Sequence, residues 1–315
     1  MHGTHMRTRR PLFAALLALG CSVPLLAQQE VMVSQYMFNQ LFLNPAYAGS
    51  HPYMSGSLLH RSQWLKVEGA PRTSMMAFDA PLLNGKMGAG LSVVHDQIGV
   101  SRDLDIAGPY AYHLRLGPES KLALGLRAGV SVYSARLSQL TYWDADDQVF
   151  QTDITNKPVG KFGFGLYWYD LRSYVGLSVP TIHATDKGLV SQINGSVTNY
   201  FTQHYYLHAG HVLNINESFD LKPSTMVKYT AAAPIEVDLN CNVLYRSKVW
   251  LGLGYRTGDA FVGMLEYQVN PMFRIGYAYD MPTSRIRTYT SGSHELMLGL
   301  DFGKEPIRIR SPRYF

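Results

Sequence analysis

Hydrophobic and polar residues alternate along most of this chain, from about residue 53 to residue 303. In the segment Ile235–Arg246, the apolar residues Ile235, Val237, Leu239, Cys241 and Val243 alternate with Glu236, Asp238, Asn240 and Asn242. Similar alternation occurs in Lys86–Asp96, Lys121–Tyr133 and Lys248–Arg256. Because successive side chains of a strand point to opposite faces, this period of two predicts strands with one apolar and one polar face.

The length of these segments separates a membrane barrel from a soluble sandwich. They run for about nine to twelve residues, which a tilted strand needs to cross a bilayer, whereas sandwich strands average nearer five or six. Aromatic residues gather near segment ends, as at Tyr110 and Tyr112, at Tyr167–Tyr169 and at Tyr205-Tyr206, where rings would meet lipid headgroups. We therefore predict an all-β fold, a transmembrane antiparallel β-barrel over residues 53–303.

The connections between the predicted strands alternate in length. Short turns rich in Gly, Pro, Asn and Ser are 81–85, 116–120, 170–172, 214–218, 246–247 and 270–271. The longer connections are 61–71, 96–102, 137–159, 181–201 and 281–291, with 231–234 and 257–259 as short exceptions. This pattern predicts about fourteen strands with short periplasmic turns and long outer loops. Since that number is even, we expect both the N- and C-termini on the periplasmic side.

The N-terminus predicts export from the cytoplasm. Three arginines in residues 7–10 precede the apolar run Leu12–Gly20, and a small residue, Ala27, precedes a polar one. This is the pattern of a signal peptide over residues 1–27. Residues 1–5 are either a tag remnant or an alternative start, with Met6 as the natural initiator.

Cysteine content and composition fit an exported all-β protein. Cys21 leaves lipidation open, although Ala18–Gly20 fits the lipoprotein signal poorly. Its removal leaves only Cys241, so no intramolecular disulfide is expected. The chain has 21 Tyr and 28 Gly among 315 residues, which suits a curved sheet with aromatic anchors. No run of about eighteen apolar residues follows the signal, so no transmembrane helix is predicted.

Candidate catalytic and metal-binding residues are sparse. His204, His208 and His211 are close in sequence, but no Cys or carboxylate partner is evident, and we predict no metal site. Ser293-His294-Glu295 is the nearest match to a catalytic triad, yet adjacent strand residues point to opposite faces. No phosphate-binding or dinucleotide motif appears. We therefore predict no enzyme activity, no cofactor and no small-molecule substrate.

Charged residues on the predicted inner faces have both signs, which favours a polar, ion-paired interior over an ion-selective pore. We favour a filled or gated lumen. Four aspartates in the 137–159 connection are read as a solvated acidic loop, although a calcium site is conceivable. These aspartates are Asp144, Asp146, Asp147 and Asp153.

The sharpest local motif is Asn44–Gly49, which reads NPAYAG. Proline fixes φ, the Asn side chain can close a turn, and Gly49 allows a positive φ, so we favour a structural turn. The alternative is a plug or partner-docking segment just inside the periplasmic mouth. Residues 28–52 as a whole are predicted to form a periplasmic N-terminal segment.

The C-terminal tail 304–315 is basic and is expected in the periplasm. Its arginines Arg308, Arg310 and Arg313 either contact an acidic partner or belong to an unstructured end. The formal net charge of +5 includes these arginines and those of the signal peptide. Export and the absence of interleaved basic and aromatic residues argue against nucleic-acid binding.

The segment Gln35–Ser50, QYMFNQLFLNPAYAGS, resembles the PorP/SprF family of type IX secretion and gliding-motility membrane proteins of Bacteroidetes. One departure is Gln40, where the family pattern favours proline. The resemblance continues, in order, through RSQW at 61–64, GAPRT at 69–73, GVSRDLD at 99–105, YAY at 110–112, KLALGLRAG at 121–129 and SGSHELMLGLDF at 291–302.

The resemblance implies a multi-pass barrel of the cell outer membrane that works with the type IX machinery. Partners would be periplasmic ring proteins or peptidoglycan-binding lipoproteins, a secreted cargo or adhesin, or both, besides membrane lipid. A passive diffusion porin is the alternative function. The candidate partner-binding residues are Asn44, Pro45, Tyr47, Gly49, Gln63, Trp64, Arg308, Arg310 and Arg313.

Overall fold

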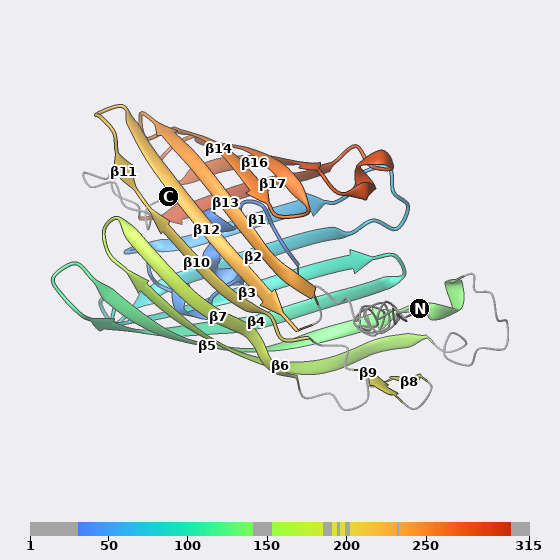
Figure 1. The fold of residues 1–315 in the computed structure, drawn as a ribbon. Helices are drawn as coiled ribbons and strands as arrows, with labels where there is room; N and C mark the ends of the chain where they lie inside the picture. Colours follow the sequence, from blue (N-terminus) through green and yellow to red (C-terminus); the bar gives the residue numbers. More distant parts are fainter. Residues whose placement is uncertain are drawn as a thin grey trace, which may run out of the picture.

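The computed structural model describes residues 31–140, 153–184, 191–193, 196–198, 202–231 and 233–303. They form one closed antiparallel β-barrel, with the segment before the first strand inside it (Figure 1). Helical structure in the described residues is limited to five short 3-10 turns. None of the helices in this described part is long and apolar enough to cross a membrane.

Fourteen strands build the wall, which confirms the predicted fold. They are β1 (Met54–Ser62), β2 (Arg72–Leu82), β3 (Met87–Ile98), β4 (Ser101–Arg115), β5 (Lys121–Ala135), β6 (Ile154–Tyr169), β7 (Ser173–Ala184), β10 (Tyr205–His211), β12 (Phe219–Thr230), β13 (Ala233–Tyr245), β14 (Val249–Arg256), β15 (Ala260–Gln268), β16 (Phe273–Pro282) and β17 (Ser293–Phe302). Each strand pairs with its neighbour in sequence, and β1 pairs with β17 to close the ring. The two-residue β11 (Leu213–Asn214) lies beside β12, while β8 (Ser191–Ile193) and β9 (Ser196–Thr198) form a separate hairpin.

The alternation of the sequence appears directly in the wall. On β5, Leu126 faces outward and is 61% exposed, while Ser131 faces the lumen and is fully buried. Exposed aromatic rings gather near the two ends of the strands, as at Tyr245 and Tyr267 on one side and Tyr229 and Tyr255 on the other. Such girdles are typical of transmembrane barrels.

Some of the aromatic residues expected at the headgroups lie inside the barrel. Successive side chains of a strand point to opposite faces, and alternate ones share a face. Tyr167 and Tyr169 are therefore buried in the lumen on either side of the half-buried Trp168, and Tyr206 is buried beside the exposed Tyr205.

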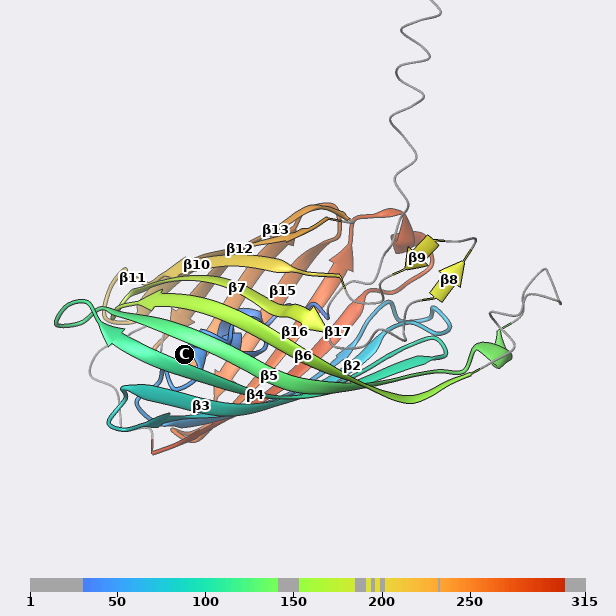
Figure 2. The ribbon, with the colours of Figure 1, turned by 90° about the horizontal axis from the view of Figure 1, so that it is seen from below.

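The connections divide the barrel into two unlike mouths. At the long-loop mouth lie the connections 63–71, 99–100, 136–153, 185–204, 231–232, 257–259 and 283–292. At the short-turn mouth lie 83–86, 116–120, 170–172, 212–218, 246–248 and 269–272. Figure 2 shows β5 and β6 reaching past their neighbours at the long-loop mouth.

One predicted long connection is wrong. Residues 96–102 do not form a loop, because β3 continues to Ile98 and β4 begins at Ser101. Gly99 has a φ of 57°, a conformation that glycine adopts without strain, and it allows a two-residue turn between the strands.

Residues 31–53, which we call the plug, cross the lumen from the long-loop mouth to the short-turn mouth. Residues 1–30 and 304–315 lie outside the described residues, so the expectation that both termini are periplasmic stays a prediction. An even number of strands does bring Met54 and Phe302 together as partners in the wall. The plug takes the chain back through the barrel, so the start of the plug at Ser34 lies near the mouth opposite to that of Phe302.

Candidate functional site

The plug is built from three 3-10 turns, η1 (Tyr36–Phe38), η2 (Gln40–Phe42) and η3 (Pro45–Tyr47). Two asparagines begin turns in the same way, since Asn39 accepts a hydrogen bond from the amide of Leu41 (3.0 Å) and Asn44 accepts one from Ala46 (2.9 Å). Such side-chain caps satisfy amides that short helical turns leave unpaired. Residues 33–41 and 43–51 are buried, so the hydrophobic core of the molecule lies around the plug.

Near the long-loop mouth, two wall carboxylates hold the start of the plug. The Ser34 hydroxyl donates to Asp280 (2.7 Å), and the amides of Ser34 and Gln35 donate to the two oxygens of Glu295 (2.8 Å each). Arg61 pairs with Asp280 at 2.6 Å and with Glu295 at 3.1 Å. Each of these side chains is buried, so the plug completes an ionic network of the wall.

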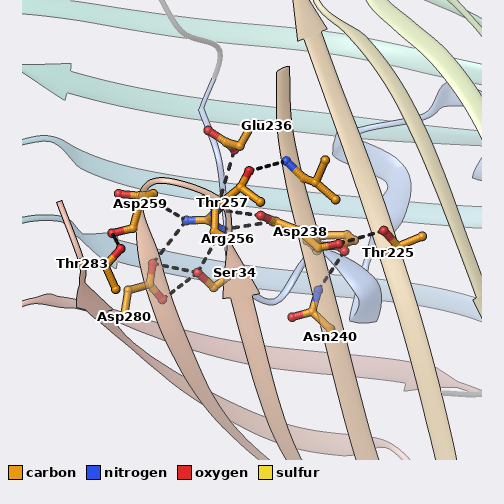
Figure 3. A network of polar contacts seen from close by, with 12 residues as sticks. Ser34, Thr225, Glu236, Asp238, Asn240, Arg256, Thr257, Asp259, Asp280 and Thr283 are labelled. Atoms are coloured by element: carbon orange, nitrogen blue, oxygen red, sulfur yellow. Dashed lines mark hydrogen bonds and ion pairs between the residues drawn. The ribbon is translucent and has the colours of Figure 1, made fainter. Parts of the chain in front are cut away.

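A second arginine extends this network along the wall (Figure 3). The Arg256 guanidinium lies 3.0 Å from Asp238, 3.2 Å from Asp259 and 3.5 Å from Asp280. It also donates to the Ser34 hydroxyl at 3.4 Å. The two arginines thus pair with several carboxylates around Ser34, as expected for an ion-paired interior.

In the middle of the lumen, two wall cations bind the backbone of the plug. The ammonium of Lys222 donates to the carbonyl of Met37 (3.3 Å) and lies 5.6 Å from the ring centre of Phe38. The Arg274 guanidinium donates to the carbonyl of Phe38 (3.4 Å). The indole of Trp250 on β14 also faces the Lys222 ammonium, at 5.8 Å, which adds a cation–π contact.

At the short-turn mouth, inward-facing glycines of neighbouring strands form a cradle for η3. A Cβ atom on Gly125 of β5 would lie 2.1 Å from the amide nitrogen of Ala46, and one on Gly88 of β3 would lie 2.0 Å from the carbonyl oxygen of Ala48. Only residues without a side chain allow this approach of plug to wall. The amide of Gly49 then donates to Asp79 (2.7 Å).

Filling this cradle is expected to expel the plug. Cys241 is exposed and is replaced by serine, so that a cysteine introduced at the buried position Ala46 reports on the plug. While the plug is in place, this cysteine should react slowly with a polar maleimide. Gly125→Val should raise the labelling rate about tenfold or more, because overpacking costs about 1–3 kcal/mol. Gly263→Val, at a site with nothing within 4 Å, is the matched control. Unchanged protection in the Gly125 variant would contradict the cradle.

The predicted partner-binding residues fall into separate groups. Asn44, Pro45 and Tyr47 are buried in the plug, and Gly49 ends its last turn with a φ of 66°. The motif is thus a turn, as predicted, and this turn is part of a plug. The rest of the candidates lie elsewhere or outside the described residues: Gln63, Trp64, Arg308, Arg310 and Arg313.

Gln63 and Trp64 lie in the β1–β2 connection at the long-loop mouth, where both are half-buried. The Trp64 amide donates to the hydroxyl of Ser293 (3.1 Å), which ties the connection to β17. The structure therefore does not bring these two residues close to the NPAYAG turn, and a role of either group in partner binding stays a prediction.

Histidine, cysteine and carboxylate groups of the described residues do not gather into a metal site. No group of three or more His, Cys, Asp or Glu in this part of the chain is arranged to hold a metal ion. His208 is buried, with its Nε2 atom 3.3 Å from the Asn44 amide nitrogen, whereas His211 is exposed. Glu295 points into the lumen, while His294 faces outward and lies 2.7 Å from the Tyr277 hydroxyl.

Of the four loop aspartates, only Asp153 lies in the described residues. The amide of Ser138 donates to its carboxylate (2.9 Å) and lowers the pKa of that group below its usual value. The contact ties the end of this acidic connection to η4 (Leu137–Gln139).

The sequence does not identify Ser34 or Arg61 as functional residues. Together with Asp280 and Glu295 they hold the start of the plug, and we call these four residues the plug anchor. Ser34 precedes every strand and has no periodic pattern around it, and Arg61 is assigned to a loop although β1 continues to Ser62. A usable signal was the parity of Arg61 with Ser55 and Ser57, polar residues on the same face of β1.

The chain matches a family model described as "Type IX secretion system membrane protein PorP/SprF" over residues 25–300. No curated protein matches it. Among solved structures it is similar to the Acinetobacter baumannii outer membrane protein Omp33, with 11% identity, a TM-score of 0.43 and coverage of 81% of this chain and 100% of that one. It is also similar to the P. putida toluene transporter TodX, with 10% identity, a TM-score of 0.46 and coverage of 84% and 94%. The chain is an outer-membrane β-barrel that belongs to the PorP/SprF family of type IX secretion system membrane proteins.

Proposed function

We propose that this protein is a plugged, non-enzymatic barrel that holds partners of the type IX machinery at its two mouths. The observation that carries this proposal is the plug, whose buried residues cross the lumen and contact the wall at both mouths. A diffusion porin needs a continuous water-filled path, which a plug held in this way opposes. The surfaces left for function are therefore the two mouths of the barrel.

The long-loop mouth offers a pre-ordered surface for a secreted cargo or adhesin. The connections 63–71 and 283–292 are joined by hydrogen bonds from the Leu65 amide to the Gly292 carbonyl (2.9 Å) and from the Ser291 amide to the Leu65 carbonyl (3.1 Å). Loops that are already fixed lose little conformational entropy when they bind. Trp64 lies in this joined rim, and tryptophan is enriched among the residues that dominate binding energy.

The short-turn mouth is the proposed docking side for periplasmic ring proteins or peptidoglycan-binding lipoproteins. Its turns are compact, and the barrel ends there at Phe302, directly before the basic segment 304–315. Arg308, Arg310 and Arg313 give that segment a positive charge suited to an acidic partner surface.

Affinity isolation of the full-length chain in mild detergent tests this proposal. Envelope lipoproteins, ring subunits or a secreted adhesin should accompany the barrel. Trp64→Ala should reduce the recovered adhesin about tenfold or more, as expected for loss of an interface anchor. The lipid-facing Trp168→Ala is the matched control. Recovery of the barrel alone, together with intact secretion in a deletion strain, would falsify the apparatus role.

A further inference from the structure

The outward face of the barrel wall carries almost no charged side chains. Among the described barrel strands, outward-facing positions hold no Asp, Glu or Lys, and only two Arg, Arg72 on β2 and Arg102 on β4. Both arginines are exposed and lie at the ends of their strands at the long-loop mouth. At this level the lipid face meets the headgroups, where an exposed cation destabilises the barrel little. It stabilises the barrel only if an anion pairs with it.

The strand register brings the two arginines together. Arg72 lies opposite Gln97 of β3, and Gln97 lies opposite Arg102. Because neighbouring strands are about 4.8 Å apart, the two backbones are separated by about 10 Å. Neither arginine forms an ion pair with a described residue.

Polar residues continue this row across adjacent strands. Ser62 of β1 lies opposite Arg72, and Ser134 of β5 lies opposite Arg102. In the next row towards the membrane, His60 and His95 both lie opposite Ser74. The row after that is apolar throughout, with Leu58, Met76, Val93, Ile106 and Val130. A basic polar band thus lies directly above an apolar surface.

A cavity lies beside this band. It has a volume of about 320 Å³, and Ser62, Arg72 and Gln97 line it together with residues 63–70. The lining includes a further cation, Lys66, and one carboxylate, Glu68. With Arg102 next to Gln97, positive charge exceeds negative charge around this space.

The loop over the cavity is fixed in a strained conformation. Trp64 and Lys66 have φ angles of 47° and 78°, in the left-handed region that residues with side chains rarely adopt. The Gly69 carbonyl accepts a hydrogen bond from the amide of Gly99 (2.8 Å), which ties the loop to the β3–β4 turn. Such strain is concentrated at ligand clamps and other functional sites.

We propose that this rim cavity binds the phosphorylated headgroup of a lipid in the leaflet at the long-loop mouth. Arginine donates several charge-assisted hydrogen bonds to phosphate oxygens, and Arg72, Arg102 and Lys66 supply the donors. The acyl chains then lie along the apolar row below the band. This site does not depend on the plug, and it shares the 63–71 connection with the surface proposed for a secreted cargo.

Native mass spectrometry of the delipidated full-length protein in detergent tests the proposal. The probes are synthetic diphosphoryl lipid A, the same lipid without phosphates, and inorganic phosphate. The wild type should retain the diphosphoryl lipid and not the dephosphorylated one. The double variant Arg72→Gln/Arg102→Gln should bind it about tenfold or more weakly, since each lost charge-assisted hydrogen bond is worth about a tenfold change.

Arg115→Gln/Arg246→Gln, which removes two exposed arginines at the short-turn mouth, is the matched control and should bind like the wild type. Equal binding of the dephosphorylated lipid, or unchanged binding by the double variant, would overturn the proposal. Inorganic phosphate that competes at the same concentration as the lipid would also overturn it, in favour of a free-phosphate site. If the double variant does not assemble, Lys66→Gln tests the site instead. It should bind the diphosphoryl lipid severalfold more weakly, and unchanged binding would contradict the site.

Discussion

Deletion of residues 31–50 is expected to turn the barrel into a conducting channel. The wall would stay closed, because its hydrogen bonds run from strand to strand and none of its fourteen strands is removed. Asp280 and Glu295 would keep Arg61 as a partner, so these wall ion pairs would remain in the emptied lumen, which would fill with water. In planar bilayers the variant should give stable channel steps, whereas the wild type should give none.

The control for this experiment is deletion of residues 304–315, which leaves both plug and strands intact and should not conduct. Heat-modifiable migration on gels checks that each variant is a folded barrel. Steady currents from the wild type would show that the plug does not seal the lumen, and the porin alternative would then replace our proposal. A folded but silent plug deletion would show that the wall collapses inward.

Arg61→Ala is expected to cost about 3–5 kcal/mol of stability, as is typical when one partner of a buried ion pair is removed. The change leaves Asp280 and Glu295 buried with less positive charge and also removes a donor to the Ser34 hydroxyl (3.2 Å). Urea unfolding followed by tryptophan fluorescence measures the free energy difference.

Arg115→Ala, at the exposed end of β4, is the matched control and should change stability by no more than about 0.5 kcal/mol. Arg61→Lys keeps the charge but not the planar, two-pronged donor, so it should recover only part of the loss. A loss below about 1 kcal/mol for Arg61→Ala would mean that water already hydrates the two carboxylates, against the burial on which the anchor rests.

The barrel could be predicted because each strand carries its own signal. Lipid on one side and polar groups on the other impose a period of two on every segment, so the outward position of Leu126 and the inward position of Asp238 follow from local sequence. Turn lengths then gave the strand number. The prediction of a long loop between β3 and β4 was wrong because its polar residues, including Asp96 and Arg102, belong to strands that continue beyond the apolar belt.

The plug could not be predicted in the same way. Its three turns are too short to show a period, and its residues are held by partners far away in sequence: Ser34 and Asp280 are 246 positions apart. The inward glycines were visible as a pattern, but the sequence does not show that Gly125 meets Ala46 rather than water. What a lumen contains depends on contacts between segments, which one sequence does not record.

The position of the plug at the start of the chain has a consequence for the order of folding. Contacts between residues distant in sequence form slowly, because the loop between them must first lose its entropy. Ser34 and Gln35 need Glu295, which lies 261 and 260 positions later on the last strand. The anchor therefore cannot form until β17 is in place, and assembly is expected to pass through an unanchored barrel. The Ser34–Gln35 end of the plug is synthesised before all the strands, yet it can pair only after the last of them is in place.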